Sequence, residues 1–184
     1  HPPQLFSQQL RNCGANMDLP DGGQGMVDRI DYKSRKRFQL WPVALLRIYT
    51  GIFFTWHGFG KINGGNFADS MNSFLMSRLE TSFPFYRPFI EVVVLPNSGI
   101  FAAMIAWGEL LIGLALVVGL ATRYAAVAGA LMVANFWFAK GESFFAGSNH
   151  DVIWLVILVV LASIPAGRVA GLDDGLSDRM PFLR

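Results

Sequence analysis

The most constraining feature of this sequence is a long apolar run that holds a single charge. Residues 98–122 read SGIFAAMIAWGELLIGLALVVGLAT, and Glu109 is the only charged residue before the run ends. About 20 apolar residues are enough to cross the hydrocarbon core of a bilayer. A carboxylate at that depth costs at least about 2.5 kcal/mol on insertion scales, so it needs a partner or a purpose. What Glu109 pairs with is the main question that the sequence raises.

Composition supports a membrane protein and excludes two other classes. The 184 residues are 53% hydrophobic and 15% charged, whereas a soluble domain carries about 25% charged residues. The net charge of +2 comes without a basic stripe interleaved with aromatics, so nucleic-acid binding is discounted. Cys13 is the one cysteine, which excludes two-cysteine thiol–disulfide chemistry within the chain.

Four apolar segments define the predicted fold, at residues 40–59, 98–120, 124–139 and 152–166. Short polar links between long apolar segments imply antiparallel neighbours, whereas an open sheet in lipid would leave backbone groups unpaired. We therefore predict an all-α fold, an integral membrane four-helix bundle with an amphipathic outer segment between the first two helices. The predicted domains are a polar extended N-terminal arm at 1–37, the membrane domain at 38–167 and a polar C-terminal tail at 168–184.

The distribution of basic residues predicts the orientation of the bundle. Ten lysines and arginines fall on the side of the two termini and four on the opposite side, with Arg47 inside a span. Basic residues are retained on the cytoplasmic side of membrane proteins. Both termini are therefore expected in the cytoplasm.

The connection at residues 61–97 lies on the outer side and is not an ordinary polar loop. Residues 67–79 (FADSMNSFLMSRL) place apolar side chains at roughly helical spacing, and residues 82–89 (SFPFYRPF) are rich in aromatics and proline. Aromatic rings favour the membrane interface. The segment is expected to pack over the outer end of the bundle as a lid, and it could also form a wall of a pocket for an amphiphile.

The first span carries a polar stripe. Arg47, Thr50, Phe54, His57 and Lys61 follow one another at spacings of 3, 4, 3 and 4 residues, so they share one face of a helix. Such a face must point into the bundle or at a water-filled cavity.

Depth along the two helices suggests a partner for Glu109. At about 1.5 Å of rise per residue, Arg47 lies roughly 9 Å and Glu109 roughly 13 Å from the cytoplasmic edge. These heights predict an Arg47–Glu109 ion pair. The pair could belong to a functional site, or it could simply tie two helices together.

Further polar groups converge on the outer half of the bundle, namely His57, Lys61, Asn135, Lys140 and the His150-Asp151 pair. With walls from Trp56, Trp107, Trp137 and Trp154, they suit a flat amphipathic ligand such as a quinone headgroup. Each has a plainer alternative. The lysines could be interfacial anchors, the tryptophans belt or core residues, and Asp151 part of a helix cap. The sequence carries neither a paired metal-ligand motif nor CxxCH, so neither metal nor haem is expected.

Two strings of residues carry a family resemblance. They are Arg47-x3-Gly51-x6-Gly58-x2-Lys61 and Trp107-Gly108-Glu109-x3-Gly113-x5-Gly119-Leu120-x2-Arg123, joined by Asn135 and Asp151. Over about residues 38–165 the chain resembles the DoxX family of small four-helix membrane proteins. That family includes the DoxD-type subunit of thiosulfate:quinone oxidoreductase, and its functions are mixed.

The resemblance implies a small membrane subunit of a quinone-linked oxidoreductase or bioenergetic complex, in the inner membrane of a bacterium or archaeon. Glu109 would be the catalytic residue, passing protons when quinone is reduced. The other residues expected to bind quinone, together with Glu109, are Arg47, His57, Lys61, Asn135 and Trp137. A soluble electron donor or a second subunit would have to carry out the other half of the reaction. The alternative is a non-catalytic accessory subunit that stabilises a larger membrane complex.

Overall fold

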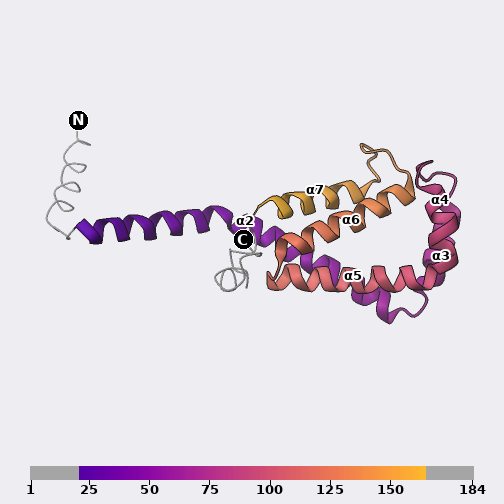
Figure 1. Ribbon diagram of the computed structural model, residues 1–184, viewed down its shortest axis with the longest axis horizontal. Coiled ribbons are helices and arrows are strands. Elements are labelled where there is room, and N and C mark those ends of the chain that lie inside the picture. Colours follow the sequence, from indigo (N-terminus) through magenta and orange to yellow (C-terminus); the bar gives the residue numbers. More distant parts are fainter. Residues whose placement is uncertain (1–20, 165–184) are drawn as a thin grey trace, which may run out of the picture. The chain divides into compact units, whose positions relative to one another are not determined.

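The computed structural model describes the backbone of residues 21–164 and the side chains of residues 41–164. The chain divides into two compact units, His1–Gln39 and Leu40–Arg184. The predicted C-terminal tail and the first 20 residues of the arm, Cys13 among them, lie outside the described residues. All regular elements between residues 21 and 164 are helical, which confirms the predicted fold class (Figure 1).

The N-terminal arm differs from the prediction. Helix α2 (Asp21–Asn63) already begins within it, so the expected extended conformation is wrong for residues 21–37. Residues 26–40 (MVDRIDYKSRKRFQL) contain neither glycine nor proline and are rich in residues with good helix propensity. The polar composition of this segment is therefore compatible with a helix and does not by itself indicate an extended chain.

The second unit contains the four predicted helices. They are the part of α2 from Leu40 onward, α5 (Ser98–Val118), α6 (Thr122–Lys140) and α7 (His150–Ser163). In Figure 1, α6 lies beside both α5 and α7 and packs against each of them. The turn between α5 and α6 places Gly119 and Ala121 in the left-handed region, at φ 72° and 49°. This tight reversal makes α5 and α6 antiparallel neighbours.

Helices α2 and α5 approach each other closely enough to touch backbone to backbone. A Cβ on Gly58 would lie 2.5 Å from the Leu110 nitrogen, and one on Gly51 would lie 2.7 Å from the Val117 nitrogen. On the opposite helix, Gly113 meets the backbone of Thr55 in the same way. Only glycine fits at such contacts, so these residues set the axial register of the two helices.

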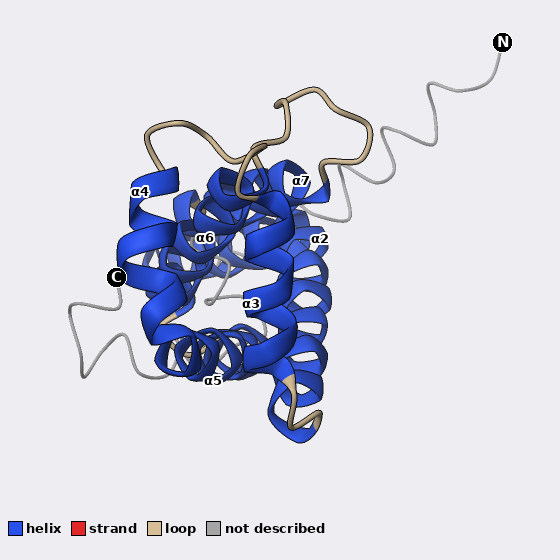
Figure 2. Ribbon diagram, turned by 90° about the vertical axis from the view of Figure 1, so that its right-hand side faces the viewer, coloured by secondary structure: helices blue, strands red, loops and turns tan. Residues whose placement is uncertain are grey.

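A helical cap covers one end of the bundle. It consists of α3 (Phe67–Arg78), α4 (Arg87–Phe89) and two further short turns, η1 (Ile90–Val94) and η2 (Leu95–Asn97). Figure 2 looks onto this end, with α3 in front of the bundle helices. Four buried side chains of the cap pack against Ala102 of α5 and Ala139 of α6. They are Met71, Leu75, Ile90 and Val94.

The cap is also held at the end of α6. Gly141 has φ +66°, and a Cβ there would overlap the backbone carbonyl of Thr81. The Phe83 amide donates a hydrogen bond to the Phe138 carbonyl, at 3.3 Å. The predicted lid over the outer end is therefore a packed part of the fold.

One stretch among the described residues is long and apolar enough to cross a bilayer. It runs over Arg87–Val118 with a mean hydropathy of 2.2 in its most apolar window, and α7 is apolar but shorter. Large apolar side chains along α2 are exposed on the bundle surface, with Trp56 at 76% and Tyr49 at 58%. Lipid is the medium in which such a surface is stable.

Candidate functional site

A pocket of about 490 Å³ lies between the cap and the bundle helices. Most of its lining is apolar, with many aromatic rings and three methionines. These residues are Phe67, Met71, Phe74, Leu75, Phe89, Ile90, Val94, Phe101, Met104, Ile105, Met132, Phe136 and Ala139. Five lining residues are polar, and they are Lys61, Ser70, Tyr86, Asn135 and Lys140. Apolar walls with a few convergent polar groups are typical of sites for small amphipathic molecules.

Lys61 connects this pocket with the buried carboxylate. It lies in the last turn of α2, and its ammonium group forms an ion pair with Oε1 of Glu109. The side chains of Lys61 and Glu109 are 23% and 5% exposed. The Lys61 nitrogen also lies 5.1 Å from the ring centre of Phe67 and 5.6 Å from that of Phe136. Attraction to two ring faces helps to hold the cation at the pocket wall.

Glu109 therefore has a different partner from the predicted Arg47. Gly58 lies against Ala106 and Leu110, which puts Glu109 at the level of Gly58. Arg47 is fully buried about 16 Å further along α2, three turns away. The predicted heights were counted from presumed ends of the spans and differed by only about 4 Å, whereas the glycine contacts show a difference of about 16 Å, so the predicted register was wrong by about two turns.

One oxygen of Glu109 has no hydrogen bond within the described residues. Oε1 accepts from Lys61, whereas Oε2 is buried without a partner. A buried oxygen of an ionised carboxylate is a strong acceptor that attracts a donor or a proton. Glu109 is not a lining residue of the pocket and lies behind Lys61.

A second polar contact crosses the pocket between the cap and α6. The Tyr86 hydroxyl donates to Oδ1 of Asn135 at 2.6 Å, and Nδ2 of Asn135 donates to the Leu131 carbonyl at 2.6 Å. Burial raises the pKa of Tyr86 above its usual 10.0. Asn135 retains one unused N–H, because its amide nitrogen carries two donors.

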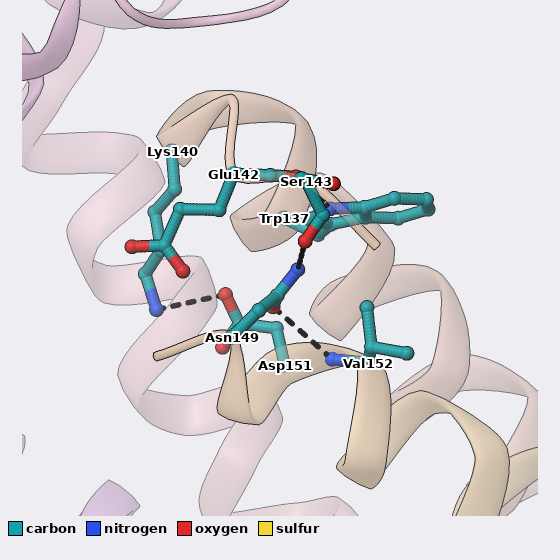
Figure 3. Close-up of polar contacts among 7 residues, drawn as sticks. All are labelled: Trp137, Lys140, Glu142, Ser143, Asn149, Asp151 and Val152. Carbon is teal, nitrogen blue, oxygen red and sulfur yellow. Dashed lines mark hydrogen bonds and ion pairs between the residues drawn. The ribbon is translucent and has the colours of Figure 1, made fainter. Parts of the chain in front are cut away.

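The C-terminal end of α6 carries a second ion pair, shown in Figure 3. The Lys140 nitrogen lies 2.7 Å from Oδ2 of Asp151, whose side chain is 12% exposed. The N-terminal cap of α7, for which Asp151 was considered from the sequence, is provided by Asn149, which accepts a hydrogen bond from the Val152 amide at 3.3 Å. Asp151 therefore forms an ion pair with Lys140, which lines the pocket.

Besides Glu109, three predicted binding residues lie outside the pocket. His57 is exposed and packs on the Phe53 ring at 4.2 Å. Its neighbour Gly58 faces α5, and successive residues of a helix are rotated by about 100°, so His57 points elsewhere. Trp137 donates from Nε1 to the Glu142 carbonyl at 2.7 Å and braces the loop before α7 (Figure 3). Arg47, at the other end of the polar stripe, is also distant from the pocket.

The structure thus brings Lys61 and Asn135 into the pocket and places Glu109 directly behind Lys61. The tryptophans expected as walls do not line it, and phenylalanine and methionine take their place. Tyr86 was not predicted as a site residue, although it lies in the aromatic SFPFYRPF segment. Met104 and Met132 were not predicted either, because in the sequence they resemble ordinary core residues. Among the residues that the structure describes, no group of three histidine, cysteine or acidic side chains is close enough to hold a metal ion.

Comparison with known proteins matches this geometry to one family. The DoxX family matches residues 43–141, which is more than half of the chain and includes α5, α6, the cap and all lining residues of the pocket. Neither a curated protein nor a solved structure matches the chain.

Proposed function

The chain belongs to the DoxX family of helical membrane proteins, and from this premise we propose that it is a small membrane subunit of a quinone-linked oxidoreductase. The quinone ring would lie in the pocket beside Lys61, above the level of Glu109. This location replaces the predicted one near Arg47. The single observation that carries the proposal is the aromatic pocket with Lys61 and Asn135 on its wall.

Size and polarity of the pocket fit a quinone ring. Its volume of about 490 Å³ falls within the range of about 300–1,000 Å³ that is common for small-molecule sites. The phenylalanine rings offer faces for stacking, and methionines adapt to irregular shapes. A quinone also needs donors for its carbonyl oxygens, which the apolar walls do not supply.

Lys61 and Asn135 supply those donors. The Lys61 ammonium has three N–H groups and donates to one carboxylate oxygen, so two remain. Asn135 has one amide N–H beyond its bond to Leu131. When bound, quinone accepts two electrons and two protons. Glu109, behind Lys61, is the group that would hold a proton near the ring, and electrons would come from a redox centre on a partner subunit.

Quinone binding to the purified full-length chain tests the proposal. In a non-ionic detergent, we expect a decyl-substituted benzoquinone to bind, as measured by calorimetry. Lys61→Met should weaken this binding by about tenfold, since a hydrogen bond to a charged group contributes ~1.5–3 kcal/mol. His57→Gln is the control, because it changes a predicted site residue that lies outside the pocket and should leave the affinity unchanged.

The outcome separates the two functions considered for this chain. Absence of quinone binding, or equal binding by the Lys61→Met variant, would contradict the pocket proposal. Such a result, together with an intact bundle, would favour the accessory role.

A further inference from the structure

We propose that the pocket selects uncharged amphiphiles over anionic ones, and that Glu109 is the residue that determines this selectivity. The inference rests on the proposed function and names the ligand class of the same site. It follows from how the two lysines of the pocket are neutralised.

The charged groups of the pocket wall are few. Among the described lining residues the charged ones are Lys61 and Lys140, and neither acidic residue that pairs with them lines the pocket. Without their partners, these lysines would form a binding site for a carboxylate or phosphate headgroup. The identity of the ligand therefore depends on what lies behind each lysine.

Behind each lysine lies one carboxylate. Glu109 pairs with Lys61 and Asp151 with Lys140, so the two pairs together carry no formal net charge. An anionic headgroup entering the pocket would have to displace a carboxylate or remain without a counter-charge among apolar walls. Both are costly at low dielectric. A neutral carbonyl oxygen can use the remaining N–H groups of Lys61 while the ion pair stays in place.

The two ion pairs differ in how strongly solvent screens their charges. The Glu109 side chain is 5% exposed and its partner Lys61 23%, whereas the Lys140–Asp151 pair is 31% and 12% exposed. Water and salt screen the second pair more strongly. Glu109 should therefore control the charge preference, with Asp151 contributing less.

Two probes with the same acyl chain, one with an anionic and one with an uncharged headgroup, test this inference. The full-length chain in non-ionic detergent is titrated separately with dodecanoate, with methyl dodecanoate and with the neutral decyl benzoquinone, and each affinity is measured directly by calorimetry. We expect the wild-type protein to favour the methyl ester. Glu109→Gln leaves Lys61 without its counter-charge, so it should tighten dodecanoate binding by about tenfold relative to the ester. Comparing this ratio between variants cancels the partition of each probe into micelles.

Two matched variants show whether charge is the cause. Lys61→Met combined with Glu109→Gln removes both members of the pair and should restore the wild-type ratio. Asp151→Asn should shift the ratio in the same direction as Glu109→Gln but by only about twofold, since its pair is better screened. The elution profile and melting temperature of each variant establish that it is folded.

Each result bears on the inference. The inference is overturned if the wild-type protein binds dodecanoate as tightly as its ester. This outcome can be read from the wild type alone, so it stands even if the Glu109→Gln variant fails to fold. An unchanged ratio in folded Glu109→Gln overturns the inference as well. If the benzoquinone binds in these cases, the proposed function stands and only the charge selectivity fails. If the benzoquinone does not bind but the ester preference and its reversal are observed, the quinone proposal fails while the charge selectivity stands.

Discussion

Lys61 makes contacts of three kinds, with the Glu109 carboxylate, with two aromatic rings and with the pocket. A lysine is suited to this position because its flexible stem lets the charge reach a neighbouring helix. The contact gives Glu109 a compensating charge and gives the pocket a hydrogen-bond donor. Tyr86 has a comparable position on the cap, since its hydroxyl reaches Asn135 across the pocket.

At this scale, Tyr86→Phe should lower the free energy of unfolding by about 1 kcal/mol, because it leaves Oδ1 of Asn135 without its donor. Chemical denaturation in detergent at pH 7 measures the loss. A variant as stable as the wild type would show that the hydrogen bond contributes nothing.

The raised pKa of Tyr86 predicts a dependence of stability on pH. The folded protein keeps the phenol proton above pH 10, where the unfolded chain releases it, so deprotonation favours the unfolded state. Stability should fall as the pH rises from 10 through the folded-state pKa, and Tyr86→Phe should reduce that slope. Unfolding experiments between pH 8 and pH 11 measure both proteins; identical slopes would contradict this assignment.

At the scale of elements, the contact between α2 and α5 decides the register of the site. Gly51, Gly58 and Gly113 replace side-chain packing by backbone contact, so a displacement along the axis would force larger residues into the same gap. The cap depends on a similar contact, where Gly141 meets Thr81.

Gly58→Ala should therefore destabilise the bundle by about 1–3 kcal/mol, as expected for overpacking against backbone atoms. Gly60→Ala is the matched control on the same helix, since nothing lies within 4 Å of the added Cβ. Alanine has the better helix propensity, so this control should be neutral or stabilising. Thermal unfolding in detergent compares the two, and equal melting temperatures would contradict the close approach of α2 and α5.

Gly141→Ala should loosen the cap rather than the bundle. The substitution adds a Cβ at a positive φ and into the carbonyl of Thr81, whereas Gly147→Ala meets nothing within 4 Å. We expect faster proteolysis between α3 and α4 in the first variant and weaker binding of the benzoquinone. Protection equal to that of the Gly147→Ala control would show that this contact does not hold the cap.

At the scale of the whole molecule, charge asymmetry predicts which side of the membrane the pocket faces. In the topology predicted from the sequence, ten of the basic residues fall on the side of the termini, and the loop between α6 and α7 falls on the other side. Phe145 in that loop is 91% exposed. Cys13, near the N-terminus, and a cysteine at position 145 can therefore report the orientation through labelling.

In intact cells, a maleimide that does not cross the membrane should leave Cys13 unlabelled. A Phe145→Cys variant in a Cys13→Ser background should be labelled. Permeabilised cells provide the control in which both cysteines react. The reverse pattern in intact cells would place the termini outside and contradict the charge rule.

Much of the fold was predictable from local pattern. Apolar length and short polar links specified the four helices, and the spacing of apolar residues at 67–79 indicated α3, because both signals act over neighbouring residues. The arm was misjudged since polarity was taken as a sign of extended chain. In the pocket, Lys61 and Asn135 carried a visible signal as polar residues in apolar segments, whereas Met104 and Met132 differ in nothing from core residues.

The sequence by itself determined that a buried carboxylate would need a cation, because an unpaired charge among apolar residues is costly at any position along the helix. The sequence also placed Arg47 and Lys61 on one polar face of α2, and the estimated depths favoured Arg47 as the partner. Only the tertiary structure showed that the partner is Lys61. The choice depends on the axial register of α2 against α5, and that register is set by glycine contacts between residues far apart in the chain. Arg47 and Lys61 are separated by about 21 Å along α2, and the contact of Gly58 with Ala106 and Leu110 places Glu109 near the Lys61 end, directly behind the pocket wall.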